Sequence, residues 1–183
     1  MQHCGIKRRK TGGSALLEFV FVGITLIFTL ISIVEMSRGM WNYHTLEYAV
    51  KASASYASVH GATCSITPNA CSVHVSDVVN VFRIAAIGVP MSQVRLTLTT
   101  ASGGATTCNP VSTCSSNAAW SNMWPPSTNS DNAIGQAIVI RADYTFRSAL
   151  AMFVPGRGVV AFGSNVGPGA FSFPGYSRQT ILF

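Results

Sequence analysis

The sequence contains few charged residues, and few acidic residues in particular. Charged residues make up 10% of its 183 residues, against about 25% in ordinary soluble domains. The six acidic residues are Glu18, Glu35, Glu47, Asp77, Asp131 and Asp143. Because general acid–base catalysis and hard-cation sites both draw on carboxylates, this small supply disfavours either chemistry.

The sequence motifs of the common enzyme classes are also missing. H-E-x-x-H, G-x-S-x-G and the P-loop do not occur. His44 and Glu47 share an expected helix face, but two groups do not make a metal site, and we interpret them as a solvated pair. His60 and His74 flank the first cysteine pair without ligand spacing. We therefore expect no catalytic activity, no cofactor and no metal.

Positive charge is present but unevenly spread. Of the twelve basic residues, four form one cluster near the start of the chain: Lys7, Arg8, Arg9 and Lys10. Without the first thirteen residues, eight basic residues remain against six acidic ones. The net charge of +6 therefore reflects a basic leader, and we predict no nucleic-acid partner.

A long apolar run follows this leader. Residues 14–34 are 21 residues with one charge, Glu18, and as a helix they would reach about 31 Å, the thickness of a bilayer core. A cleaved secretory signal would be shorter and end in a small-x-small site, which residues 31–35 do not offer. A buried core helix is the other alternative, and it is disfavoured because the run has no polar face. The preceding basic cluster predicts a cytoplasmic N-terminus, with everything after Arg38 outside.

Cysteine usage agrees with export. Four of the five cysteines form two close pairs, Cys64 with Cys71 and Cys108 with Cys114. Four cysteines allow three connectivities, and we favour the two local disulfides because both segments resemble loops. A four-cysteine zinc site is the alternative, although neither pair has the C-x2–4-C spacing of zinc knuckles. Cys4 stands apart in the leader.

The residues at the start of the apolar run form a recognisable motif. Residues 12–19 read Gly-Gly-Ser-Ala-Leu-Leu-Glu-Phe. A buried unpaired carboxylate costs several kcal/mol, so Glu18 either reaches the lipid head groups or has a partner. The arrangement resembles the processing site of type IV pilins and pseudopilins, most closely in the tight-adherence branch. The resemblance implies cleavage by a prepilin peptidase between Gly13 and Ser14; a cut after Gly12 would place Glu18 one position too late.

The sequence of the following helix also resembles the TadE-like family. The stretches 13–22, 33–38 and 46–57 show that family's Glu-Phe start, its Glu near the helix end and its Ala-rich continuation. Where members usually carry a proline soon after Glu-Phe, this chain has Val22-Gly23-Ile24. The resemblance implies an assembly role for Glu18 and Phe19, in which the Glu18 carboxylate pairs with the free Ser14 amine of a neighbouring subunit.

We expect the helix to continue to about residue 60. Apolar residues recur there at three- to four-residue spacing: Trp41, Tyr43, Leu46, Val50, Ala54 and Ala57. Trp41 and Tyr43 also suit the aromatic belt at a membrane surface. The Ala/Ser-rich stretch 52–57 allows close packing, either on the domain's own sheet or on another subunit.

The sequence of the outer domain predicts a short helix followed by strands. Ser76-Asp77 is interpreted as the cap of a helix over 78–87, with a strand as the alternative. Alternating patterns predict strands over 93–100 and 136–146, and further strands are expected over 159–162 and 178–183, separated by a Gly/Pro-rich turn over 163–175. Residues 101–135 are expected to form a long loop. We favour docking of its tryptophans, Trp120 and Trp124, on the domain's own sheet, with an exposed contact patch as the alternative.

The predicted fold class is α+β, with a transmembrane α-helix followed by a small antiparallel sheet domain, as in pilins. The expected segments are a leader (1–13), a membrane helix (14–38), its amphipathic continuation (39–61) and an exported domain (62–183). The resemblance implies a minor pilin-like subunit in the bacterial inner membrane, with a periplasmic domain and possible incorporation into a pilus. Its implied partners are the lipid bilayer, other pilin or pseudopilin subunits, the prepilin peptidase and the inner-membrane pilus assembly platform. The alternatives are an uncleaved bitopic envelope protein that binds a partner or surface ligand, and a secreted enzyme or inhibitor.

Overall fold

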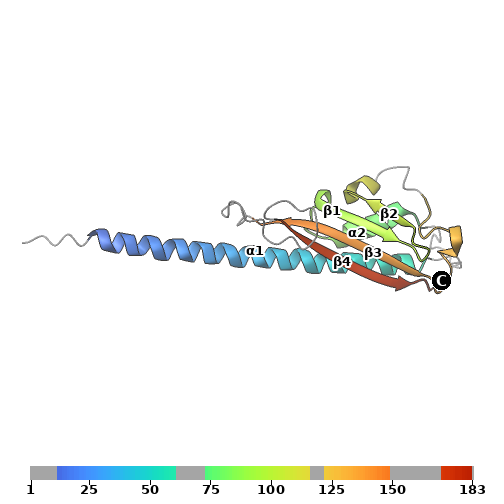
Figure 1. Ribbon diagram of the computed structural model, residues 1–183, viewed down its shortest axis with the longest axis horizontal. Helices are drawn as coiled ribbons and strands as arrows, with labels where there is room; N and C mark the ends of the chain where they lie inside the picture. Colours follow the sequence, from blue (N-terminus) through green and yellow to red (C-terminus); the bar gives the residue numbers. More distant parts are fainter. Residues whose placement is uncertain (1–11, 61–72, 116–121, 149–169, 183) are drawn as a thin grey trace, which may run out of the picture.

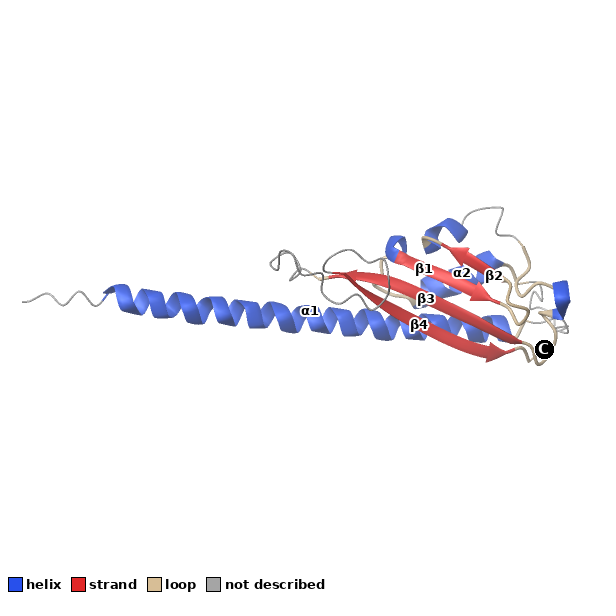
Figure 2. Ribbon diagram, viewed as in Figure 1, coloured by secondary structure: helices blue, strands red, loops and turns tan. Residues whose placement is uncertain are grey.

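The molecule is a long helix that carries a small sheet domain, the head, on its C-terminal half (Figure 1). The structure is a computed structural model, and it describes residues 12–60, 73–115, 122–148 and 170–182. Helix α1 (Gly12–Ser58) is bare over its first half and lies along the sheet over its second half (Figure 2). This arrangement confirms the predicted α+β class.

Helix α1 has 47 residues, which corresponds to about 70 Å. Among the described residues it is the one helix long and apolar enough to cross a membrane, with a mean hydropathy of 2.5 in its most apolar 18-residue window. The hydroxyls of Thr25 and Ser32 donate to the carbonyl oxygens of Phe21 and Phe28, at 2.9 and 2.8 Å. These internal hydrogen bonds satisfy the hydroxyls without water, so the segment is compatible with an apolar environment.

The sheet has four antiparallel strands in the order β2-β1-β3-β4. The strands are β1 (Val94–Thr99), β2 (Ala105–Cys108), β3 (Ala137–Arg147) and β4 (Ala170–Thr180). The predicted alternation in β1 and β3 is confirmed, because the apolar residues at every second position are buried. Leu96 lies opposite Ala142 in β3 and opposite Cys108 in β2, which fixes one apolar face across three strands.

The second half of α1 and helix α2 (Val75–Ala85) cover this apolar face (Figure 1). Leu46, Val50, Ala54 and Ala57 are fully buried there, so the Ala/Ser-rich stretch of α1 packs within its own domain. Trp124 is 2% exposed and belongs to the same core, as predicted. Trp120 lies outside the described residues.

Helix α2 begins earlier than predicted. It starts at Val75, with His74 as its N-cap, so the interpretation of Ser76-Asp77 as the cap of a helix over 78–87 is wrong. Asp77 is the third helical residue, and its Oδ2 accepts the backbone N–H of His74 at 2.9 Å. A carboxylate at this position satisfies a backbone donor that the helix leaves open.

The described parts of residues 101–135 contain regular structure where a long loop is predicted. They contain β2 and two short 3-10 helices, Val111–Cys114 and Thr128–Ser130. Asp131, only 3% exposed, accepts the backbone N–H of Ser102 at 2.9 Å and its hydroxyl at 2.5 Å. Side-chain hydrogen bonds therefore organise a stretch whose composition indicated a loop.

Strand β4 is also longer than predicted, since it begins at Ala170 inside the expected turn over 163–175. Pro174 is tolerated because β4 is an edge strand, where a missing N–H need not break the ladder. Leader residues 1–11, the Cys64–Cys71 pair and the predicted strand over 159–162 lie outside the described residues.

Candidate assembly site

The predicted processing and assembly residues lie together at the start of α1. Gly13 and Ser14 belong to its first turn, and Glu18 follows Ser14 by four residues, which places both on one helix face. Gly13 and Glu18 are exposed, and the Phe19 side chain is 77% exposed. Within the part of the chain that the structure describes, Glu18 has no hydrogen bond or ion pair. Its carboxylate is therefore accessible to a partner from outside the chain.

The apolar half of α1 is exposed on every side. None of its most apolar 18-residue window is buried in the molecule. The large exposed side chains of this half are Leu16, Leu17, Phe19, Val20, Phe21, Val22, Ile24, Leu26, Ile27, Phe28, Leu30, Ile33 and Val34. A helix that is apolar all round is stable only among other apolar groups, in a bilayer or in a helix bundle.

An ion pair marks the point where α1 enters the head. Glu35 is 8% exposed, and its Oε1 accepts a hydrogen bond from Arg38 Nη1 at 2.8 Å. The Arg38 guanidinium carbon also lies 5.9 Å from the centroid of the Phe146 ring in β3, a cation–π distance. Arg38 therefore connects the end of the apolar stretch to the sheet.

Aromatic side chains from two strands hold the helix at this point. Phe173 of β4 lies 6.5 Å from Tyr144 and 5.7 Å from Phe146, between ring centroids, and Tyr43 of α1 approaches Phe173 edge-on at 6.2 Å. The helix backbone passes beside this cluster at Gly39, where an added Cβ would lie at an ordinary contact distance of 3.7 Å from Phe173 Cζ. Burial raises the pKa of the Tyr144 hydroxyl, while the positive charge of Arg38 acts in the opposite direction.

Sequence reasoning identified Glu35 but missed this aromatic cluster. Phe173 was assigned to a turn, so its pairing with β3 was not expected. A signal was available in the alternation of aromatic residues, Tyr144 with Phe146 and Phe171 with Phe173, which the register places opposite one another. Aromatic pairs across neighbouring strands are typical of antiparallel sheets.

A groove opens between α1 and the head at the same level. Its volume is about 670 Å³, and it is lined by Ile33, Val34, Ser37, Arg38, Trp41, Asn42, Gly88, Pro90 and Tyr144. The lining changes from aliphatic side chains on the apolar half of the helix to aromatic and polar groups next to the head. The groove therefore joins the two parts of the molecule.

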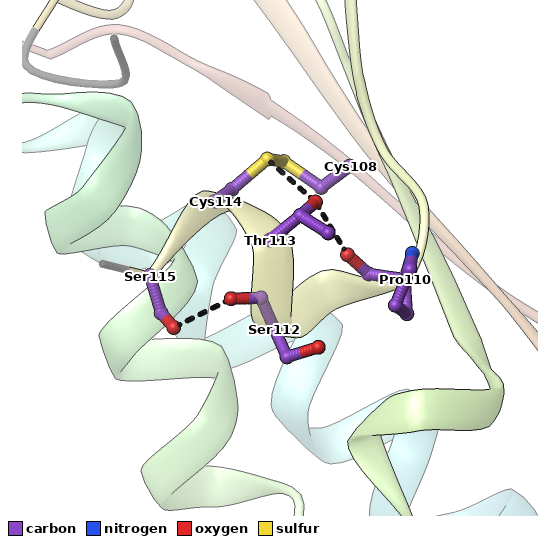
Figure 3. The surroundings of a disulfide bond; sticks show 6 residues. All are labelled: Cys108, Pro110, Ser112, Thr113, Cys114 and Ser115. Carbon is purple, nitrogen blue, oxygen red and sulfur yellow. Dashed lines mark hydrogen bonds between the residues drawn. A yellow bond between two sulfur atoms is a disulfide. The ribbon is translucent and has the colours of Figure 1, made fainter. Parts of the chain in front are cut away.

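One of the two predicted disulfides lies in the described residues. Cys108 at the end of β2 and Cys114 are bonded, with their Cα atoms 5.7 Å apart (Figure 3). Between them, the Thr113 hydroxyl donates to the Pro110 carbonyl oxygen at 2.8 Å. The bond closes a small ring at an edge strand of the sheet, and Cys108 and Cys114 are both buried in the core.

In the described ranges, no group of three or more His, Cys, Asp or Glu side chains could hold a metal ion. Of the predicted solvated pair, His44 is exposed and Glu47 is partly buried.

Comparison with known proteins gives one result. A family model described as TadE-like protein matches residues 13–55. No curated protein and no solved structure matches the chain. The matched segment contains the Gly13 to Phe19 motif, the Glu35–Arg38 pair and most of the part of α1 that packs on the head. The similarity to a TadE-like protein is thus confined to this helical segment.

Proposed function

We propose that this protein is a minor pilin-like subunit that takes part in assembling a tight-adherence pilus or a related secretion apparatus. It is anchored in the bacterial inner membrane by α1, with its N-terminus in the cytoplasm and its head in the periplasm. A prepilin peptidase removes the leader after Gly13. The role is one of assembly and contains no catalytic step.

The observation that carries this proposal is that the exposed, apolar half of α1 has an accessible carboxylate, Glu18, near its start. After cleavage, the free amine of Ser14 and the carboxylate of Glu18 lie one helical turn apart. Between neighbouring subunits, such a pair of opposite charges offsets the cost of placing each in a low-dielectric helix bundle. The remaining partners are other pilin or pseudopilin subunits and the inner-membrane assembly platform.

The head is suited to a subunit that moves as one body with its helix. Arg38 of α1 contacts Phe146 of the sheet and Tyr43 of α1 contacts Phe173, so side-chain packing joins the exposed half-helix to the head. Transfer of α1 from the bilayer to a fibre would therefore carry the head with it, without rearrangement of the joint.

The first experiment is mass spectrometry of the N-terminus of the protein isolated from membranes of the cell that produces it. We expect a mature chain that starts at Ser14, and a chain that keeps its leader in the Gly13→Val variant. A wild-type chain that starts at Met1 would favour the alternative, an uncleaved bitopic envelope protein whose head binds a partner.

A second variant separates processing from assembly. Glu18→Gln should be cleaved normally but should be lost from sheared surface fibres, because the neutral amide cannot pair with the Ser14 ammonium. Glu47→Gln is the matched control, since it removes a carboxylate from the same helix within the head. Equal recovery of both variants in fibres would contradict the assembly role of Glu18.

A further inference from the structure

Three large apolar side chains are exposed together at one end of the head. Ile84 near the end of α2 is 78% exposed, Ile87 just after it is 70% exposed, and Trp41 of α1 is 65% exposed. Gly88, which follows Ile87, lies close to Trp41, because a Cβ at this glycine would lie 3.6 Å from Trp41 Nε1. The positive φ of Gly88, +84°, turns the chain after Ile87 and suits glycine at this close approach.

The core of the head does not account for these isoleucines. Helix α2 buries Val75, Val78, Val79 and Phe82, which already form a complete apolar stripe against α1 and the sheet. Ile84 lies outside that stripe, and Ile87 follows it three residues later, just past the end of the helix. Neighbouring Arg83 is exposed and adds a cation to the same end of the helix. Clustered exposed apolar residues beside a cation are typical of a membrane-surface contact.

The position of these residues agrees with a membrane surface. In Figure 1 the exposed half of α1 leaves the head at the end where β1 begins, and the segment that holds Ile87 and Gly88 leads into β1. Trp41 comes seven residues after Val34, about 10 Å along the axis. Helical side chains lean towards the N-terminus, so the indole reaches back towards the polar layer of a bilayer, roughly 5–8 Å thick on each side.

The groove between α1 and the head makes the connection continuous. It is lined by Ile33 and Val34 at the end of the apolar run, and by Trp41 and Gly88 beside the exposed isoleucines. The groove therefore joins the membrane helix to the exposed end of the head, and Arg38, its one charged lining residue among those the structure describes, is paired with Glu35.

We propose that Trp41, Ile84 and Ile87 form an interfacial seat, through which the head rests in the headgroup layer of the outer leaflet of the inner membrane, with Arg83 beside the lipid phosphates. This inference rests on the membrane anchoring in the proposed function. The seat fixes the height and rotation of the head over the bilayer before the subunit enters a fibre. Tryptophan and isoleucine next to arginine match the mixed apolar and anionic chemistry of this layer.

The test uses fluorescence quenching by phospholipids brominated near the glycerol end of their acyl chains. The full chain is reconstituted in vesicles of phosphatidylcholine and phosphatidylglycerol, with Trp41→Phe as the parent. A tryptophan is then introduced as Ile87→Trp in the seat or as Ile134→Trp. Ile134 is the matched control, since it is 58% exposed and neighbours Gly135, whose N–H bonds the Ile181 carbonyl at the far end of the head, beside Ser58.

We expect brominated lipid to remove about half of the added fluorescence at position 87 and almost none at position 134. Adding Ile84→Glu should restore most of the fluorescence at position 87, because the charge moves the seat out of the layer. Ile27→Trp, within the span, reports insertion. If position 27 is quenched and position 87 is not, the seat is overturned while membrane insertion of α1 is supported. Burial of position 87 only at high protein density would also overturn the seat, because it would identify a second copy of the chain as the partner of this surface. If position 27 is not quenched, the anchor and the seat are both overturned, whereas the processing site is tested separately by the mature N-terminus.

Discussion

Gly175 of β4 lies against Val50 of α1 so closely that an added Cβ would come within 3.1 Å of Val50 Cγ2. The same Cβ would lie 3.4 Å from Leu46 Cγ, and both helix residues are fully buried. Neither can move into solvent to make room. We therefore expect Gly175→Val to destabilise the head by about 1–3 kcal/mol, as overpacked cores are, measured by chemical denaturation in detergent micelles.

A second substitution distinguishes overpacking from other effects of losing this glycine. Val50→Ala removes the atom that the new side chain would strike, so the double variant should be more stable than the sum of the two single changes predicts. Gly39→Ala is the control, because its Cβ would meet Phe173 Cζ at an ordinary 3.7 Å. Strict additivity of Gly175→Val and Val50→Ala would contradict the packing argument.

The parts of the fold that the sequence predicts well are those set by periodicity. The apolar run of α1 and the alternation around Leu96 and Ile140 each follow a simple repeat, and both elements are where the pattern placed them. The class of fold followed from these patterns, and the resemblance to pilins implied the same architecture. The same periodicity placed Leu46 and Val50 on the buried face of the helix.

The parts that the sequence predicts poorly depend on contacts between distant residues. Pro174 and Gly175 indicate a turn locally, yet edge position and the close approach of Val50 make them part of a strand. Asp131 and Ser102 are 29 residues apart, and their hydrogen bonds order a polar stretch that has no periodic pattern. The same holds for the candidate site. The motif at Gly13 to Phe19 is local and can be predicted from the sequence, whereas the aromatic cluster around Phe173 depends on contacts between distant residues.

The disulfide between Cys108 and Cys114 should stabilise the head by about 2 kcal/mol, because it closes a ring with a sequence separation of 6 and small rings remove little chain entropy. Replacing both cysteines by alanine should lower the midpoint of urea denaturation accordingly. Dithiothreitol should lower the wild-type midpoint by at least as much and should have a smaller effect on the double variant. A wild-type midpoint unchanged by reduction would contradict this role.

The start of α2 provides a sharper test of the structure. Asp77 accepts the His74 backbone N–H at 2.9 Å, so Asp77→Ala should cost about 1 kcal/mol through loss of the cap. Ser76→Ala is the matched control, since the capping role belongs to Asp77 and surface changes away from such features stay within about 0.5 kcal/mol. The reverse order of effects would mean that the helix starts later, as its sequence first indicated.

Asp131 should make the stability of the head depend on pH at the acidic end. The hydroxyl of Ser102, first, and further hydrogen bonds from Thr100 and the Ser102 backbone hold the pKa of this carboxyl below its ordinary value of 3.8, although burial acts in the opposite direction. A carboxyl whose pKa is lower in the folded chain than in the unfolded one stabilises the fold above its unfolded pKa, and this contribution disappears as the pH falls through the folded pKa. Asp131→Asn should therefore melt at a lower temperature than wild type at neutral pH, and the difference should shrink as the pH falls below 3.8.

Asp143→Asn serves as control, because that carboxylate accepts its hydrogen bonds from Arg141 on the outer face of the sheet. A melting-temperature difference for Asp131→Asn that stays constant from neutral to strongly acidic pH would show that the Ser102 contact does not stabilise the charged carboxylate.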